Sequence, residues 1–372
     1  MADYVIYDVT VSLLTPLHIG TGRDLLHEYD YAIRAGKTWR INEDALLDAQ
    51  DVDDPDLARQ LAQIKPVELL QPADYRPDSG YFRYVLQGTP RSSAVGAQLK
   101  EQIKDPYDHP YLPGSSLKGA LRTAVAWHAW GERKLQPETR QLGRSKKWAG
   151  QDYERQLLGK NPNHDLLRAL QVSDSIPLKA DQLMVINARV LNRGGKMDGA
   201  PVEMEALRPD ASLKLTIKLD LALFSDWARK GGLNLSGRAW LEHLGTVVGG
   251  HSQDLARREA AWFGQMHGLD RVAGFYKQLA GFQPSDRRFL ISLGWGTGWT
   301  DKTFGSRLLE NERFMERIID DYRMTRGSRH TGDPFPKSRR AVVSVQKDRN
   351  GRILETPVSP LGWCLVEMKE RK

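Results

Sequence analysis

YVIYDVTVSL, residues 4 to 13, opens the chain with a regular alternation of apolar and polar side chains. Every second residue from Val5 to Leu13 is apolar, and Asp8, Thr10 and Ser12 lie between them. A period of two is typical of a strand with one buried face. The stretch therefore predicts a half-buried β-strand at the start of the chain.

Further strand patterns follow in both halves of the chain, interleaved with helical ones. The expected strands are at 28–35, 37–41, 81–88, 183–192, 212–223, 288–296, 341–346 and 361–368. Helical periodicity is expected from Ser115 to about Trp130, in roughly 235–280 and near 308–324, and Asn42 is placed to cap a helix that begins after it. Strands mixed with a few helices, twice over, predict an α+β fold.

The most economical arrangement is two ferredoxin-like lobes of the type used by RNA-recognition motifs, with insertions and Gly-rich loops. The predicted domains are 1–176, with inserted segments near 51–80 and 130–170, and 177–372, with a hairpin near 183–223 and a Gly-rich loop at 294–298. Within the second insertion, 133–147 is a basic connector that contacts either RNA or protein. A fold of this kind does not by itself assign a function.

Charge and cysteine content limit the class of partner and the compartment. The 54 Lys and Arg residues exceed the 47 Asp and Glu residues, so the net charge is +7 and favours polyanions. Cys364 is the single cysteine and cannot form an intramolecular disulfide, which is typical of a reducing compartment. No signal peptide or long apolar stretch is present, so we expect a cytoplasmic location without a membrane partner.

YLPGSSLKGALRTAV, residues 111–125, combines a turn with the start of a helix. In the simpler interpretation Pro113 and Gly114 form the turn and a serine caps the helix. Free N–H groups at a helix start also attract anions, and the motif adds cations one turn apart. The candidate phosphate ligands are Ser115, Ser116, Lys118 and Arg122. The spacing departs from the nucleotide-triphosphate loop, so we favour an RNA backbone phosphate.

TPLHIGTGR, residues 15–23, follows the first strand and supplies His18, Gly20 and Arg23 as candidate RNA contacts. Glycines permit close approach of a ligand to the backbone. For His18 the alternatives are a catalytic role and a packed, backbone-bonded ring. Asp24, Asp30 and Asp174 lie near Gly-rich turns and have the chemistry for RNA cleavage, although isolated aspartates there are more often caps and turn residues.

LGWGTGWTDKTFG, residues 293–305, alternates glycines with aromatic and polar residues. Trp295 or Trp299 could stack on a base, and Lys302 could contact a phosphate, with Gly296 and Gly298 allowing close approach. The alternative is that both tryptophans belong to the core.

A basic loop follows and supplies the last candidate contacts, Lys337, Arg339 and Arg340. The histidines show no HxH or HxxxH pairing and no second cysteine is present, so we expect neither a zinc site nor another cofactor.

Four motifs together resemble the RAMP superfamily of CRISPR effector proteins, most closely the fifth-subunit family of the type III-A Csm complex. The motifs are TPLHIGTGR followed by EYDYAI, YLPGSSLKGALRTAV, LGWGTGWTDKT, and FPKSRR followed by PLGW. The second motif is common to many RAMP proteins, and the last two together discriminate the subunit. The resemblance covers nearly the whole chain except 51–80 and 130–170.

The resemblance implies a non-catalytic RNA-binding subunit that caps the backbone filament at the 3′ end of the CRISPR RNA. It also implies a role in CRISPR RNA maturation through host nucleases, a role in target RNA binding, and partners among the other Csm subunits, especially the backbone subunit. It places Gly294, Gly296, Gly298 and Lys302, and the serines and cations of the second motif, near RNA. The alternative is an endoribonuclease or backbone-type subunit that cleaves target RNA with Asp24 or Asp30.

Overall fold

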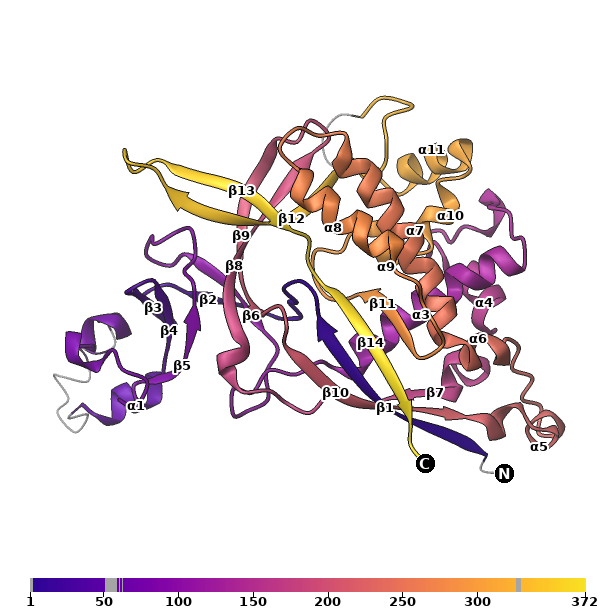
Figure 1. The fold of residues 1–372 in the computed structure, drawn as a ribbon, viewed down its shortest axis with the longest axis horizontal. Helices are drawn as coiled ribbons and strands as arrows, with labels where there is room; N and C mark the ends of the chain where they lie inside the picture. The colour runs from indigo at the N-terminus through magenta and orange to yellow at the C-terminus, as the bar shows by residue number, and fades with distance from the viewer. Residues whose placement is uncertain (1–2, 51–58, 60, 62, 326–328) are drawn as a thin grey trace.

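The computed structural model describes residues 3–50, 59, 61, 63–325 and 329–372. Within these residues, two β-sheets pack with helices, as Figure 1 shows. The α+β class predicted from the sequence is confirmed.

The first sheet, sheet A, is built around the strand that opens the chain. The order of its strands in the described residues is β11 (Arg288–Ser292), β14 (Trp363–Glu370), β1 (Tyr4–Leu13), β10 (Ser212–Asp220) and β7 (Leu170–Val172). All neighbours are antiparallel, and Val9 lies opposite Leu215 of β10 and Met368 of β14. Tyr7, Val9, Val11 and Leu13 are buried, as the alternation in β1 predicts.

The second sheet, sheet B, has more strands than sheet A, and two of its hairpins are long. Its strand order is β2 (Gly20–Leu26), β6 (Gln98–Gln102), β9 (Met197–Leu207), β8 (Leu183–Asn192), β5 (Phe82–Gln87), β4 (Lys37–Ile41) and β3 (Tyr31–Arg34), with β12 (Ser338–Lys347) pairing β8 and β13 (Ile353–Ser359). β8 and β9 form one hairpin. β12 and β13 form the other, which extends away from the body in Figure 1.

Helices cover one side of sheet A and enclose the main core. Leu117, Leu121, Ala124 and Val125 of α3 all face this core, as predicted. The described α-helices are α1 (Glu43–Asp48), α3 (Gly114–Glu132), α4 (Gln151–Leu158), α5 (Asp226–Lys230), α6 (Arg238–Glu242), α7 (Leu244–Gly264), α8 (Asp270–Gly281), α9 (Trp299–Lys302), α10 (Gly305–Leu308) and α11 (Glu312–Asp321). None of the described helices is long and apolar enough to cross a membrane.

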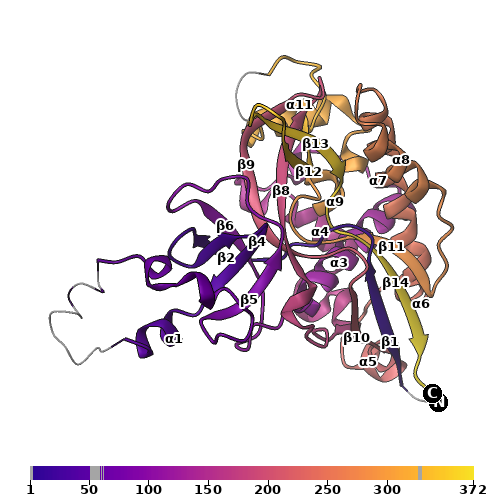
Figure 2. The ribbon, with the colours of Figure 1, turned by 60° about the vertical axis from the view of Figure 1, so that its left-hand side comes forward.

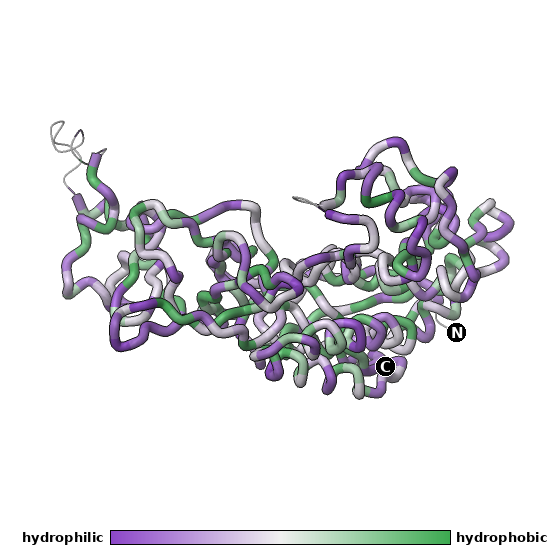
Figure 3. The backbone as a smooth tube through the Cα atoms, turned by 90° about the horizontal axis from the view of Figure 1, so that it is seen from above, coloured by the Kyte–Doolittle hydropathy of each residue, from purple (hydrophilic) through white to green (hydrophobic). Residues whose placement is uncertain are grey.

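Short 3-10 helices connect these elements. They are η1 (Pro66–Leu69), η2 (Pro72–Asp74), η3 (Thr139–Gln141), η4 (Lys146–Trp148), η5 (Pro162–His164), η6 (Leu166–Ala169), η7 (Ala180–Gln182) and η8 (Leu221–Phe224). Figure 3 shows hydrophilic segments along the periphery of the chain and hydrophobic segments concentrated within it.

Strands β3 to β5 and helix α1 form a small projection with its own core. Trp39, Tyr75 and Phe82 pack together there, with ring centroids 4.9 to 5.6 Å apart. Figures 1 and 2 both show this projection extending away from the large helices. The side chain of Asn42 accepts from the N–H of Ala45, which confirms it as the cap of α1. Of the predicted insertion at 51–80, residues 51–58, 60 and 62 lie outside the described residues.

Both sheets draw strands from each side of the predicted domain boundary at 176/177. Sheet A joins β1 from the first half to β10, β11 and β14 from the second. The two chain ends lie close together in Figures 1 and 2, because β1 and β14 are adjacent antiparallel strands. The division into two lobes at this boundary stays a prediction.

Candidate nucleic-acid interface

The N-terminus of α3 binds a carboxylate of the chain itself. The N–H of Gly114 donates to Oδ1 of Asp174 at 2.7 Å. A Cβ at Gly114 would lie 2.4 Å from the carbonyl oxygen of Val172, so this position has room only for glycine. An aspartate is the kind of anion that a helix start attracts. Asp174 therefore has the capping role that was the alternative to a catalytic one, and it occupies part of the predicted phosphate cradle. The expected serine cap is wrong, because the helix begins at Gly114 and its N-cap residue is Pro113.

The other members of the α3 motif differ in how accessible they are. Ser115 is exposed and Ser116 is half-buried. Burial lowers the pKa of Lys118. Nη1 of Arg122 lies 2.6 Å from Asp165, and Nη2 lies 3.3 Å from Glu154. Contacts of these four residues with RNA stay predictions. A phosphate at Arg122 would compete with the ion pairs that this guanidinium forms with Asp165 and Glu154.

His18 is a buried histidine bonded to the backbone. Its Nδ1 donates to the carbonyl oxygen of Glu205 at 2.6 Å, and its exposed fraction is 1%. Burial lowers the pKa of His18 to about 4, so the ring is neutral at physiological pH. The structure therefore shows the packed, backbone-bonded ring, and the imidazole of His18 does not reach the surface of the molecule.

Gly20 and Arg23 lie on β2 (Gly20–Leu26), beside Asp24 and Asp30, the aspartates of the endoribonuclease alternative. Both are exposed, and Arg23 forms an ion pair with Asp30 at 2.6 Å. Asp30 is buried and also accepts the N–H of Leu26 at 2.7 Å, so it fixes the turn between β2 and β3. Asp24 pairs with Lys100 at 3.1 Å on the neighbouring strand. Both aspartates thus have structural partners in this fold.

Three of the four family motifs meet through backbone hydrogen bonds. The N–H of Trp295 donates to the carbonyl of His18 at 2.8 Å. Gly362, in the PLGW segment, donates to Pro16 at 2.9 Å and accepts from Leu293 at 2.8 Å. Motifs that are hundreds of residues apart in the sequence therefore form one junction between the two sheets.

The Gly-rich loop at this junction has a backbone that requires glycine. Gly294, Gly296 and Gly298 have φ of +76°, +91° and +95°, all in the left-handed region. A Cβ at Gly294 would lie 2.4 Å from the carbonyl oxygen of His18, whereas a Cβ at Gly298 would meet nothing within 4 Å. The loop is therefore packed at its start and open at Gly298.

Both tryptophans of the loop are half-buried, which lies between the two predicted alternatives of a ring exposed for base stacking and a ring in the core. Trp295 packs against a small core cluster, and the Arg340 guanidinium lies 4.8 Å from its ring centroid. Trp299 starts α9 and contacts Phe335 edge to face at 5.0 Å. Lys302 at the end of α9 is exposed, next to the buried Asp301, whose pKa is raised by burial to about 6.

The FPKSRR segment leads into β12 and contributes three cations. Nε of Arg339 lies 2.7 Å from both carboxylate oxygens of Glu259, and its guanidinium lies over Trp262. Lys337 pairs with Asp333 at 2.9 Å. Arg340 is exposed. Arg339 is thus mainly an anchor of β12 on α7, while Arg340 faces solvent.

A cavity of about 1020 Å³ brings several of these segments together. We call it the central cavity. The predicted contacts among its described lining residues are Arg122, Gly296, Gly298, Lys302, Lys337, Arg339 and Arg340. The other seven predicted contacts do not line the cavity: His18, Gly20, Arg23, Ser115, Ser116, Lys118 and Trp295. The structure therefore collects half of the predicted site around one cavity.

The central cavity also includes residues that the sequence did not identify as ligands. Asn192, Asp198 and Gly199 come from the β8–β9 hairpin, and Lys146 comes from the basic connector. Among the described lining residues, six are Lys or Arg and three are Asp or Glu, so the cavity is basic. Such a surface attracts phosphate groups. No cluster of three or more metal-ligating side chains is present in the described residues.

Similar proteins are found among CRISPR proteins. Two Mycobacterium tuberculosis proteins called "CRISPR system Cms protein Csm5" are 31% identical over 230 residues, which are 59% of this chain and 54% of each relative. The match thus spans about half the length of these relatives. A Methanocaldococcus jannaschii protein of the same name is 23% identical, over 98% of this chain and 89% of its own. The resemblance to the fifth-subunit family is confirmed.

Solved structures share the fold along nearly the whole chain. One is a chain of a "Csm-crRNA-target RNA ternary complex in type III-A CRISPR-Cas system", with a TM-score of 0.67, 23% identity and coverage of 98% of this chain and 100% of that one. Another is "T.onnurineus Csm5", with a TM-score of 0.63, 24% identity and coverage of 96% and 99%. The RAMP superfamily model matches residues 10–300, well over half of the sequence, and this chain therefore belongs to the RAMP superfamily.

Proposed function

We propose that this chain is a non-catalytic, RNA-binding subunit of a type III-A CRISPR effector complex that caps the backbone filament at the 3′ end of the CRISPR RNA. The names of its relatives and its superfamily support a place in such a complex. The partners in this proposal are the CRISPR RNA, target RNA and the neighbouring Csm subunits, with host nucleases engaged during CRISPR RNA maturation. The cytoplasmic location stays a prediction.

One observation carries the RNA-binding part of the proposal. The Gly-rich loop, the FPKSRR segment and Arg122 of α3 line one basic cavity although they lie far apart in the sequence. Exposed Lys302 and Arg340 supply charge, and the open position at Gly298 allows a ligand to approach the backbone. Contacts of this kind engage phosphates without selecting a base, as a guide of variable sequence requires.

Neutralising the cavity cations tests this proposal. In reconstituted complexes, Lys302→Ala combined with Arg340→Ala should weaken CRISPR RNA binding about tenfold at physiological salt, because two phosphate contacts are lost. Lys277→Ala is the matched control, since Lys277 is exposed on α8 and does not line the cavity. Equal affinity of the double variant and the control would reject the cavity as the RNA-binding site.

The non-catalytic assignment is supported by the partners of Asp24, Asp30 and His18. Asp24 and Asp30 form ion pairs with neighbouring basic residues, and the His18 ring is buried on the backbone of Glu205. Incubation of the complex with target RNA, with and without divalent ions, tests the assignment. RNA products that disappear in Asp24→Ala or Asp30→Ala would establish the endoribonuclease alternative.

The capping position is tested by copy number. Native mass spectrometry of the assembled complex should find one copy of this chain per complex, because a cap closes one end of a filament. Several copies, increasing with the length of the CRISPR RNA, would instead identify a backbone-type subunit.

A further inference from the structure

The central cavity has an apolar side that phosphate binding alone does not require. Four half-buried rings line it, and we call them the ring wall: Trp299, Phe304, Tyr322 and Phe335. Trp299 and Phe335 lie in segments that also carry cavity cations, because Lys302 follows Trp299 and Lys337 follows Phe335. Aromatic and basic side chains therefore line the same cavity.

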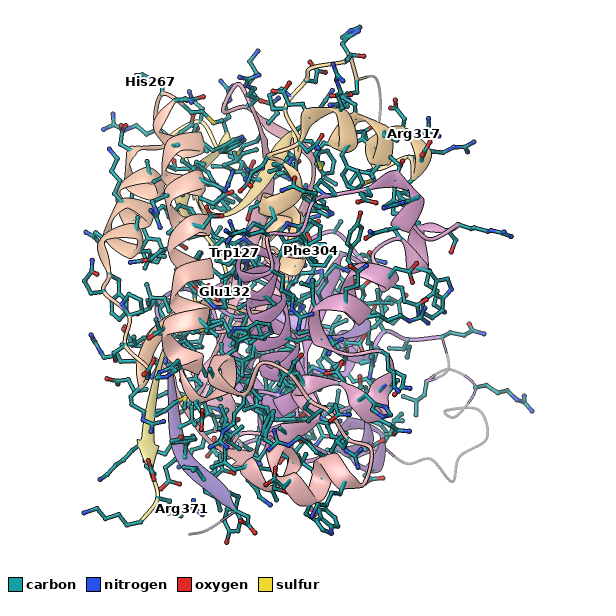
Figure 4. The ribbon with its side chains drawn as sticks, turned by 90° about the vertical axis from the view of Figure 1, so that its right-hand side faces the viewer. Trp127, Glu132, His267, Phe304, Arg317 and Arg371 are labelled. Carbon is teal, nitrogen blue, oxygen red and sulfur yellow. The ribbon has the colours of Figure 1, made fainter. Side chains whose placement is uncertain are left out.

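The rings are held in place by contacts with neighbouring groups and, for Trp299 and Phe335, with each other. Phe304 stacks on Trp130 at 5.2 Å, and Trp299 contacts Phe335 edge to face at 5.0 Å. The hydroxyl of Tyr322 donates to the carbonyl of Gly143 at 2.6 Å. Figure 4 shows Phe304 in the middle of the molecule, far from the peripheral Arg317 and Arg371. The ring wall is thus a preformed surface rather than a set of free side chains.

The part of each half-buried ring that faces the cavity is unfavourable in water unless a partner covers it. The cations beside the ring wall select an anionic partner. Nucleic-acid strands combine phosphates with flat π-faces, and each stacked base contributes about 1–3 kcal/mol by alanine substitution. Within a base-paired duplex the bases stack on one another, so only its terminal pairs have a face open to a protein ring. The cavity volume of about 1020 Å³ is larger than one base would fill. It is comparable with the largest small-ligand sites, whose volumes range from roughly 300 to 1,000 Å³.

We propose that the central cavity binds a few unpaired nucleotides of a single RNA strand, with bases on the ring wall and phosphates on Lys302, Lys337 and Arg340. This inference rests on the proposed RNA-binding function and names the form of RNA that the cavity takes. Stacking tolerates any base, so the cavity would accept unpaired nucleotides of any sequence. Paired guide and target nucleotides would lie outside the cavity.

The experiment compares two probes on the purified full-length chain. One is a short fluorescent ribo-oligonucleotide, and the other is an abasic ribose-phosphate oligomer of equal length and charge. Phe335→Leu removes a π-face from the ring wall but keeps an apolar side chain, and Phe304→Leu is a second variant at an independent position. Phe275→Leu is the matched control, because Phe275 is a half-buried ring on α8 that does not line the cavity. Thermal unfolding identifies any variant that does not fold.

The proposal predicts that the wild-type chain binds the base-bearing oligomer at least tenfold more tightly than the abasic one. Each ring-wall variant should lose about tenfold in affinity for the base-bearing oligomer. Neither should change affinity for the abasic oligomer, and Phe275→Leu should change neither affinity. Equal losses for both oligomers, or no loss for either, would overturn the stacking role. Cavity occupation by an apolar protein segment would give the second of these results.

Failure of the RNA-binding function has a different signature. If Lys302→Ala with Arg340→Ala leaves the affinity for both oligomers unchanged, phosphates do not bind in the cavity and both proposals fail. If this double variant weakens binding of both oligomers while the ring-wall variants do not discriminate between them, the phosphate contacts stand and only the stacking proposal is rejected.

Discussion

At the scale of single residues, the junction of the two sheets depends on positions where glycine has no substitute. Gly294 lies against the carbonyl of His18, and that same carbonyl accepts the N–H of Trp295. His18 therefore contributes through its backbone to the Gly-rich loop and through its ring to β9. The sequence pattern located both loops, but the contact between them depends on folding across more than two hundred residues.

Gly294→Ala should destabilise the chain by more than Gly298→Ala. Both positions have left-handed φ, which is strained by about 1–3 kcal/mol in a residue other than glycine. Only at Gly294 would the added Cβ also lie 2.4 Å from a backbone oxygen, so the loss of unfolding free energy in Gly294→Ala should exceed this range. Chemical denaturation of the two variants measures the difference in unfolding free energy. Equal losses would contradict the close packing at the junction.

Asp301→Asn should stabilise the chain at pH 8 by about 3 kcal/mol, the free energy that corresponds to the rise in the pKa of this carboxyl. Burial raises the pKa of Asp301 from an ordinary value of 3.8 to about 6, so above pH 6 the folded state contains a charged, desolvated carboxylate. Between pH 6 and 4 the folded state binds the proton more tightly than the unfolded state, so the wild type gains stability as the pH falls. The benefit of Asp301→Asn should therefore shrink toward pH 4.

Denaturant unfolding of wild type and Asp301→Asn at pH 8 and pH 5 checks this sign. Asp198→Asn is the control, since Asp198 is exposed on the β8–β9 hairpin. A penalty from Asp301→Asn that is the same at both pH values would show that hydrogen bonding, rather than desolvation, controls this carboxylate.

At the scale of secondary-structure elements, α3 shows both the strength and the limit of sequence patterns. Its buried face follows from one helical period, and Leu117, Leu121, Ala124 and Val125 could be predicted for that reason. Its cap could not be assigned to a partner, because Asp174 is sixty residues away from Gly114. The strands β6 and β13 lacked the expected alternation, and β13 contains Pro357, which is tolerated at a sheet edge.

Asp174→Ala should lower the free energy of unfolding by about 1 kcal/mol, since it removes the acceptor for the first N–H of α3. Asp174→Asn retains an acceptor oxygen and should lose less. Thermal unfolding of both variants measures the effect. CRISPR RNA affinity should stay unchanged in Asp174→Ala, because Asp174 does not line the central cavity. Tighter RNA binding would instead indicate that phosphate can replace the carboxylate at α3.

At the scale of the whole molecule, the fold class and the family could be predicted from local patterns and motif order. The central cavity could not be predicted in this way. Its lining includes residues of α3, the Gly-rich loop, the β8–β9 hairpin and β12, and only the tertiary structure brings these segments together. The ring wall was hidden for the same reason. Phe304, Tyr322 and Phe335 look like ordinary core residues until the cations beside them are placed.

The salt dependence of RNA binding should report the number of cavity contacts. The logarithm of the association constant should fall linearly with the logarithm of salt concentration, because phosphate contacts release counterions. Lys302→Ala and Arg340→Ala should each reduce the magnitude of the slope by about 0.7, as expected for one contact with a single strand. Slopes that are the same in wild type and variants would exclude these two residues as phosphate ligands.

The most direct test of the capping proposal is crosslinking of CRISPR RNA in the assembled complex, with the attached nucleotides and peptides both identified. We predict attachment confined to the 3′ part of the CRISPR RNA, through the peptides that contain Lys302 and Arg340. Attachment that repeats at regular intervals along the guide, or no attachment to these peptides, would contradict the account.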